Sequence, residues 1–460
     1  MNPHVGILYR PRPRNNSSLQ LSLNHPKPFT KTMFITRLLI AVSLIGLSGR
    51  LAIGASLPAW TFIGSSNELT SVQQLSAVIT PTTNNFMLVG IYNGGAAAIL
   101  RLDDAGNKLF RTLANPATPG GMTCGGVAID LEGNAVVGFT YTGSTTTFTF
   151  PNTNFSVFGG FIAKIDTVGN VLWQQFIRGG PPSQIKVDSA GNIYYAVNHT
   201  AQLFIGPDAS FGAPANAYGS TTLIKLASNG VPIWIRDISA AGYTGTVNTE
   251  SFSVDNNSVF VTGQFNKGLT WGTNAVTATA YKEYLGRLNA ADGSFGWSYI
   301  FGLNTSGSDC LVAGGNLWVN GSDGFGTKTI YKFQTNGTLV ASVTPPFATG
   351  YFRALTNNDF AFIGFGYVHY SNDLSILYAT TNLALAKSIN LTNYFVYDIN
   401  PAGDLYVTGN YGDQYGYRSA GKIRAPEYVA NITVQPPKIT NALTVFMGFT
   451  VGLTAAGTPP

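Results

Sequence analysis

Short apolar segments alternate with turns rich in Gly and Asn along most of the 460-residue chain. In one recurring pattern, such a turn precedes a short run of β-branched and aromatic residues, for example IYYA at 193–196. These residue types favour strands, and Gly and Asn tolerate the positive φ angles of tight turns. The pattern predicts a β-hairpin and occurs seven times, with turns at 83–85, 132–134, 190–192, 256–258, 314–316, 357–359 and 402–404.

A second pattern follows the first and also predicts a hairpin. A basic residue lies five positions before its turn Gly, or six in the fourth copy, and an aromatic residue lies four positions after that Gly. The sixth and seventh copies, at 375–389 and 420–432, have lost the pattern. We expect the aromatic rings to pack between repeats and the basic groups to bond neighbouring loops or lie on the rim. The recurring residues are Arg101, Lys164, Lys225, Arg287 and Lys332, with Phe110, Trp173, Trp234 and Trp297.

Two hairpins give four strands per repeat, and equivalent turns are 43 to 66 residues apart. Four-stranded units at such a period are typical of β-propellers, which bury sheet faces and leave only short edges. The sequence therefore predicts an all-β, seven-bladed propeller of antiparallel four-stranded blades over 56–431. The excess length falls in the loops that join the two hairpins of blades 2, 3 and 4. Residues 58–63, with Trp60, look like a last strand without a partner, so we expect them to complete blade 7 and close the ring.

The two patterns resemble the bacterial secreted β-propeller repeat often called SBBP. The best matches are 188–196, 161–173 and 398–409, which follow its D-x-x-G-N-V-Y-V-T-G and F-V-A-K-L-D-x-x-G-x-x-x-W segments. The resemblance covers about residues 56–432. It implies a propeller fold in a secreted or surface protein and is uninformative about the ligand, because a fold does not determine function.

The first 55 residues form a basic leader. Arg37 precedes an apolar run at 38–47, which suits the core of a signal peptide and is too short for a membrane span of about 20 residues. We assign 33–55 to a signal peptide, with a signal anchor as the alternative. Residues 1–32 are rich in Pro, Asn and Ser, and we expect either a disordered leader or a mis-assigned start before Met33.

The charge of the chain is concentrated in this leader. Seven of the 26 basic residues lie in 1–55, which leaves 19 basic against 21 acidic residues beyond it. A basic stripe is the electrostatic signature of a nucleic-acid-binding protein, and the rest of the chain lacks one. We therefore expect no nucleic-acid partner, no membrane span after signal cleavage, a secreted or surface location and a monomer.

The last segment, 432–460, resembles the opening strands of a bacterial immunoglobulin-like domain. It contains an alternating apolar pattern from Val445 to Leu453. Ordering 29 residues costs about 45 kcal/mol, and offsetting that needs roughly 1,800 Å² of buried apolar area, more than two strands provide. This partial domain is therefore disordered, packs on the propeller, or belongs to a truncated product.

The sequence contains no recognised catalytic or cofactor motif. Cys/His spacing for a metal, a nucleophile elbow and a phosphate loop are all missing, so we expect no cofactor and no metal. Cys124 and Cys310 fall on blades 2 and 5, too far apart to bridge. Carboxylates recur just before the first turn, and repetition at these positions favours turn capping over a Ca²⁺ or acid–base role. They are Asp130, Asp188, Asp255 and Asp398.

Departures from the repeat suggest a binding surface. The middle loops predicted for blades 6 and 7, at 366–373 and 410–418, concentrate Tyr beside polar residues. Tyr provides contact area at low entropic cost, which suits sugar stacking or a protein contact, although loop Tyr can also simply cover blade edges. The candidate ligand-binding residues are Tyr367, His369, Tyr370, Tyr411, Asp413, Tyr415, Tyr417 and Arg418.

Two functional hypotheses follow. The first is a non-catalytic, extracellular recognition or adhesion module that binds a glycan or protein. The alternative is a propeller-type extracellular enzyme, either a glycan hydrolase or lyase or a quinone-dependent dehydrogenase. The enzyme would require two carboxylates, or His with Arg, converging near the axis.

Overall fold

The computed structural model of the chain describes residues 58–63, 75–79, 85–92, 96–117, 122–141, 146–157, 159–180, 182–206, 211–213, 219–239, 245–271, 274–303, 309–322, 328–347, 350–364, 366–381, 391–400, 403–411 and 418–423. These residues are nearly all in strands or turns, apart from one 3₁₀ turn at Thr356–Asn358. Within these ranges, no helix is long and apolar enough to cross a membrane. The predicted leader (1–32), signal peptide (33–55) and partial domain (432–460) lie outside the described residues.

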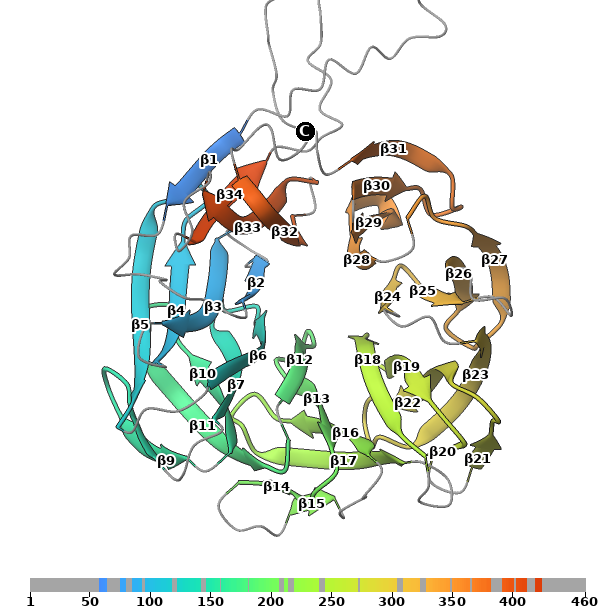
Figure 1. Ribbon diagram of the computed structural model, residues 1–460, viewed down its shortest axis with the longest axis horizontal. Helices are drawn as coiled ribbons and strands as arrows, with labels where there is room; N and C mark the ends of the chain where they lie inside the picture. Colours follow the sequence, from blue (N-terminus) through green and yellow to red (C-terminus); the bar gives the residue numbers. More distant parts are fainter. Residues whose placement is uncertain are drawn as a thin grey trace, which may run out of the picture. The chain divides into compact units, whose positions relative to one another are not determined.

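The described strands form seven antiparallel sheets, numbered here 1 to 7 in chain order and built on four strands each (Figure 1). The first strands are β2 (Leu75–Ile79), β6 (Met122–Ile129), β12 (Pro182–Val187), β18 (Val247–Val254), β24 (Asp309–Ala313), β28 (Gly350–Ala354) and β32 (Leu391–Ile399). The second strands are β3 (Phe86–Tyr92), β7 (Ala135–Tyr141), β13 (Ile193–His199), β19 (Ser258–Phe265), β25 (Asn316–Ser322), β29 (Phe360–Gly364) and β33 (Leu405–Tyr411).

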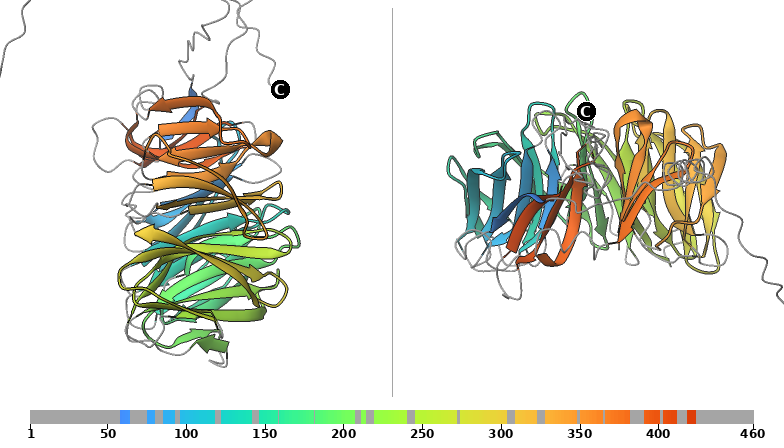
Figure 2. Two further views of the ribbon diagram at one scale, coloured as in Figure 1. Left: turned by 90° about the vertical axis from the view of Figure 1, so that its right-hand side faces the viewer. Right: turned by 90° about the horizontal axis from the view of Figure 1, so that it is seen from above.

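The third strands are β4 (Ala96–Leu102), β10 (Gly160–Ile165), β16 (Ser220–Leu226), β22 (Lys282–Asn289), β26 (Lys328–Gln334), β30 (Gly366–Tyr370) and β34 (Arg418–Ile423). The fourth strands are β5 (Lys108–Pro116), β11 (Val171–Arg178), β17 (Pro232–Ser239), β23 (Phe295–Leu303), β27 (Leu339–Val343), β31 (Ile376–Thr381) and, in sheet 7, β1 (Pro58–Ile63). In sheets 1 to 6 the four strands follow one another as a meander, so both repeated turns lie at the same end of the strands; Figure 2 shows the sheets from the side. We call this side the turn face.

The first strands bring the sheets together. They contact one another in the order β32, β2, β6, β12, β18, β24 and β28 (Figure 1). Their neighbours along each sheet bury apolar side chains between sheets, and one cluster joins sheets 1 and 2 through Ile99, Phe139 and Phe161. The described part of the chain is therefore an all-β, propeller-like arrangement. Cys124 and Cys310 are buried and form no disulfide, on β6 and β24.

The last strand of sheet 7 comes from the other end of the described chain. β1 pairs antiparallel with β34, so the Trp60 strand lies in sheet 7 as the sequence predicts, and Trp60 lies opposite Lys422. The register shifts by one residue beside this pair, as it does beside Lys164 and Trp173 in sheet 2. Sheet 7 therefore contains a strand pair equivalent to the second hairpin of the other sheets, although its two strands, β34 and β1, are far apart in the sequence.

Sheet 6 differs from the sequence prediction. Residues 366–370 form strand β30 and not a loop, and the turn to β31 follows at Ser371–Ser375. His369 lies opposite Tyr378, with the register shift that accompanies the Lys–Trp pair elsewhere. His369 therefore occupies the position of the repeated basic residue. The sixth copy of the second hairpin therefore begins earlier in the chain than the sequence predicts, because His and Tyr replace Lys and Trp.

The excess length of sheets 2 to 4 forms extra hairpins. Each extra hairpin follows the second strand of one sheet in the chain but pairs with the preceding sheet. The three hairpins are β8 (Thr146–Thr149) with β9 (Asn154–Val157), β14 (Leu203–Ile205) with β15 (Phe211–Ala213), and β20 (Gly268–Trp271) with β21 (Asn274–Thr277). They pair with the ends of β5, β11 and β17 respectively. Because an open strand edge invites pairing with other chains, these hairpins shield sheets 1 to 3.

Candidate functional site

The Tyr residues predicted for blade 6 belong to the core. Tyr367 and Tyr370 are fully buried on β30, and the Tyr370 ring stacks on Phe360 with ring centroids 5.1 Å apart. Burial raises the pKa of the Tyr370 phenol to about 12. Neither ring has a free face for a sugar, so the expectation of an exposed Tyr loop at this position is wrong.

His369 lies beside these rings and is largely buried. Its Nε2 is 3.1 Å from Oδ2 of Asp359, in the first turn of the same sheet. The position matches that of Lys164, whose Nζ is 2.8 Å from Asp130 in the first turn of sheet 2. The contact is therefore a variant of the repeat and not a separate reactive group.

The blade 7 part of the predicted site is described only in part. Tyr411 is the last residue of β33, and Arg418 is the first residue of β34. In the pairing of these two strands, Arg418 lies opposite Asn410, the residue before Tyr411. Their side chains, and all of Asp413, Tyr415 and Tyr417, lie outside the described residues. This half of the predicted surface stays a prediction.

The repeated Lys and Trp form a clasp between adjacent sheets. In sheet 3, Lys225 Nζ and Trp234 Nε1 both donate to the backbone carbonyl of Ala290, in the second turn of sheet 4, at 2.8 and 3.1 Å. Lys225 also lies 5.1 Å from the centre of the Tyr194 ring. Burial lowers the pKa of Lys225, and Asp188 opposes that shift. The predicted inter-repeat roles of these residues are confirmed at this position.

The Gly in the second turn of each following sheet packs against the aromatic ring of this clasp, as Gly230 of sheet 3 does against Trp173 of sheet 2. Gly230 has φ of +87°, and a Cβ there would lie 2.8 Å from the ring of Trp173 in sheet 2. Trp173 Nε1 donates to Ser228 O in the same turn at 3.0 Å. Gly293 and Gly337 are placed similarly against Trp234 and Trp297. The recurrence of Gly in the second turn thus reflects both backbone conformation and the aromatic ring packed against it.

Turn capping explains three of the four recurring carboxylates. Asp130, Asp188 and Asp255 each accept backbone N–H groups from the turn that follows. Burial opposes ionisation of Asp130, but hydrogen bonds from Lys164 and Asn134 outweigh it and lower the pKa. Asp398 differs because it lies within β32, and the capping role in sheet 7 belongs to Asn400, whose Oδ1 accepts Asp404 N–H at 2.8 Å.

Two carboxylates lie on first strands, where the enzyme hypothesis requires them. Asp398 accepts from Arg353 Nε on β28 at 2.9 Å. Asp309 accepts from the Ser251 hydroxyl on β18 and from Phe352 N–H on β28, the latter at 2.6 Å. Each carboxylate therefore joins first strands of adjacent sheets. This engagement is what a structural role predicts.

A polar pocket of about 310 Å³ lies on the turn face between sheets 3 and 4. Sheet 4 departs from the repeat at this place. Its first turn closes from Asp255 to Ser258, one residue shorter than Asp188 to Asn192, and its second turn closes from Asn289 to Ser294, one residue longer than Asp166 to Asn170. The pocket is lined by Asp188, Ser189, Ala190, Asn192, Lys225, Asn256, Asn257, Asn289 and Ala291.

Most charged groups of this pocket are already engaged. Both Asp188 oxygens accept hydrogen bonds from Asn192, and Oδ2 also accepts from the Tyr194 hydroxyl at 3.0 Å. Lys225 is committed to Ala290. The Asn256 Oδ1 accepts from Ser189 at 2.6 Å. The groups that remain available to a ligand in this pocket are therefore mainly neutral side-chain amides of Asn.

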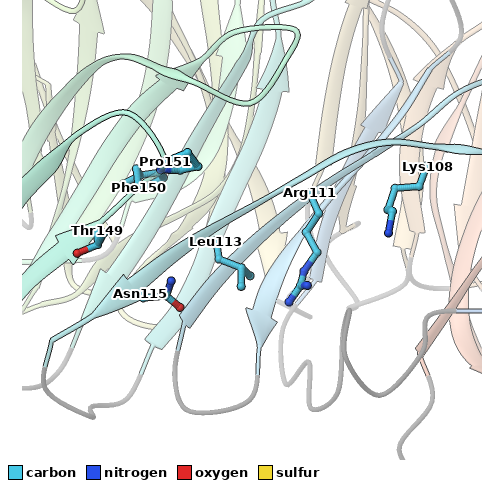
Figure 3. A pocket seen from close by; sticks show the side chains of 7 residues that line it. All are labelled: Lys108, Arg111, Leu113, Asn115, Thr149, Phe150 and Pro151. Atoms are coloured by element: carbon cyan, nitrogen blue, oxygen red, sulfur yellow. The ribbon is translucent and has the colours of Figure 1, made fainter.

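A larger hollow, of about 540 Å³, lies on the outer strand β5 and the β8–β9 turn (Figure 3). Lys108 and Arg111 extend from one end of β5, and Asn115, near the other end of this strand, pairs with Thr149, which lies beside Phe150. Both cations have interaction partners in the structure.

Comparisons with known proteins do not assign the chain to a family. No protein-family model matches it, and no curated protein matches it. Among solved structures, Raptor from Chaetomium thermophilum aligns at 8% identity with a TM-score of 0.45, over 80% of this chain and only 28% of the Raptor chain. BamB from Moraxella catarrhalis aligns at 12% identity with a TM-score of 0.27, over 67% of this chain and 94% of BamB.

Proposed function

We propose that the chain is a non-catalytic recognition module built on a closed, seven-bladed β-propeller. The observation that carries this proposal is the clasp of Lys225 and Trp234 on Ala290, which holds turns of neighbouring sheets in fixed positions. A preorganised surface loses little conformational entropy on binding. Clasps of this kind recur between sheets, so the turn face is a rigid platform for a partner.

Closure of the seven blades by β1 is part of the same proposal. The pairing of β1 with β34 supports it, because it supplies the fourth strand that sheet 7 otherwise lacks. The contact between Lys422 of sheet 7 and Asp104 of sheet 1 also supports it. In a closed ring the first and last sheets pack against each other and leave no open end, which would make the platform rigid.

We further propose that the protein is exported and works as a monomer outside the cytoplasm, on a glycan or a protein. The leader pattern at 33–55 and the resemblance to the SBBP repeat support export. The partial immunoglobulin-like segment at 432–460 fits a surface protein made of several modules. The engagement of Asp309 and Asp398 in contacts between sheets favours recognition over the enzyme alternative.

An array of defined oligosaccharides, incubated with the full chain, tests this function. We expect selective retention of a subset of glycans, and unchanged glycan masses when the bound material is recovered and weighed by mass spectrometry. Cleavage or oxidation of a retained glycan would support the enzyme alternative and contradict recognition without turnover.

A further inference from the structure

The turn-face pocket between sheets 3 and 4 contains amide groups that the fold does not use. Within the described ranges, the Asn257 carboxamide has no hydrogen-bond partner, and the same holds for Nδ2 of Asn256 and Nδ2 of Asn289. The Oδ1 atoms of Asn256 and Asn289 accept from Ser189 and from Ala291 N–H, which orients both side chains. The pocket is thus bordered by three side-chain amides whose N–H groups have no partner within the described ranges, and two of these amides are held in place through their oxygens.

The irregular turns of sheet 4 create this arrangement. The shortened turn places Asn256 and Asn257 at its exposed tip, where Asp255 caps the backbone at 2.7–2.8 Å. The lengthened turn brings Ala290 N–H to 3.0 Å from Asn257 O, so the two turns of sheet 4 are bonded to each other. The amides are therefore held on a fixed backbone, which lowers the entropic cost of binding.

The base of the pocket is equally fixed. Ala290 O accepts from Lys225 and Trp234, and Tyr194 is bonded to Asp188. Both aromatic rings are buried beneath the pocket, with Trp234 only 5% exposed. A ligand would meet hydrogen-bonding groups at the rim and no exposed ring face, so recognition here would depend on hydrogen bonds and not on stacking.

The chemistry of this pocket suits a neutral sugar. A carboxamide offers both donors and an acceptor, which matches hydroxyl groups that do both. An acidic ligand would face Asp188, whose oxygens already accept four hydrogen bonds, and the one cation, Lys225, is engaged. The volume of about 310 Å³ is at the lower end of the range for small-molecule sites, about 300–1,000 Å³, so it fits one sugar residue.

We propose that Asn256, Asn257 and Asn289 form a binding site for one neutral, uncharged sugar residue, such as the end of a glycan chain. The inference rests on the proposed recognition function and places it on sheets 3 and 4. It differs from the sequence-based expectation, which assigned the glycan surface to the Tyr-rich segments of blades 6 and 7.

Methyl glycosides of mannose, galactose, glucose and N-acetylglucosamine, titrated into the full chain and followed by saturation-transfer NMR, test the site. At least one should bind the unaltered chain. The double variant N257A/N289A should lower that affinity by about tenfold, because two amide hydrogen bonds are lost. The matched control is N336A, since Asn336 is an exposed turn residue whose Oδ1 accepts Thr338 N–H as Asn289 accepts Ala291 N–H.

The possible failures are distinguishable. If a glycoside binds the unaltered chain and N257A/N289A equally well, the site is overturned while glycan recognition stands. If no glycoside binds the unaltered chain, the carbohydrate pocket is overturned, and retention of larger glycans on the array decides the recognition function separately. An equal loss in N336A would show that the effect is not specific to the pocket and would also overturn the site.

Discussion

Lys422 Nζ lies 2.6 Å from the carboxylate of Asp104, although 318 residues separate them in the sequence. The Tyr406 hydroxyl donates to the same carboxylate at 2.8 Å. Burial and the neighbouring Asp104 raise the pKa of the Tyr406 phenol, so it remains a donor at neutral pH. Lys422 thereby makes with sheet 1 the kind of clasp that Lys225 makes with sheet 4.

The Lys422–Asp104 contact should contribute measurably to stability. Lys422 is buried but Asp104 is about half exposed, so we expect a coupling energy of about 1 kcal/mol. A double-mutant cycle of Asp104→Ala and Lys422→Met, followed by urea unfolding, measures it. Strictly additive single effects would mean that the contact contributes nothing to holding the two sheets together.

Replacing different turn Gly residues by Ala should lower the free energy of unfolding by different amounts. Gly230→Ala introduces a Cβ 2.8 Å from Trp173 at a φ of +87°, and we expect a loss of about 2–4 kcal/mol from strain and overpacking. Gly315 has φ of +76° with no atom within 4 Å, so Gly315→Ala should cost only about 1 kcal/mol. Urea denaturation of both variants isolates the contribution of the ring, and equal losses would contradict the clasp.

The buried pair Glu283–Lys328 joins sheets 4 and 5 with 2.5 Å between its charged atoms. Both side chains are almost fully buried, at 0% and 3% exposure. Lys328→Met strands a carboxylate in the interior, and we expect a loss of about 3–5 kcal/mol. The double variant with Glu283→Leu should recover much of this loss. A double variant less stable than Lys328→Met, measured by thermal unfolding, would contradict the explanation.

Lys186 on β12 should destabilise the fold at neutral pH. Burial lowers its pKa from the ordinary 10.5 and the charge of Arg353 lowers it further, and together they outweigh the opposing carboxylates of Asp309 and Asp398. The unfolded chain then holds the proton more tightly than the native state, so the penalty applies below the lowered pKa and disappears as pH rises toward 10.5. Lys186→Met should raise the melting temperature by about 2 °C at pH 7, with a smaller gain near pH 10.

The exposed Lys267 provides the control for that experiment. Lys267→Met should leave the melting temperature almost unchanged at both pH values, because a solvated ammonium carries no burial penalty. A lower melting temperature of Lys186→Met at pH 7 would mean that the ammonium makes a favourable contact instead.

The regular part of the fold could be predicted from the sequence because local chemistry dictates it. Gly and Asn mark the turns, and the Lys–Gly–Trp spacing reflects a contact that each sheet repeats. The place of strand 58–63 in sheet 7 was also predictable, since a last strand stood without its hairpin partner. The second hairpin of sheet 6 is not predictable in this way, because His369 and Tyr378 keep the strand register of the repeated pair while changing its residue types.

The turn-face pocket could not be predicted in the same way. It depends on which side-chain atoms of the turns stay unbonded, as at Asn257, and that is decided by how the two turns of sheet 4 contact each other and the first turn of sheet 3. One signal was present, because Arg287 lies six positions before its turn Gly where the other copies have five. That extra residue belongs to the lengthened turn that borders the pocket.

We propose above that β1 closes the seven sheets into one rigid unit. Native-state hydrogen exchange on the full chain, resolved by mass spectrometry, tests it most directly through the amides of β1, β34 and β4. We expect β1 and β34 to exchange as slowly as β4, through opening of the whole unit. Rapid exchange of β1 while β4 stays protected would contradict closure.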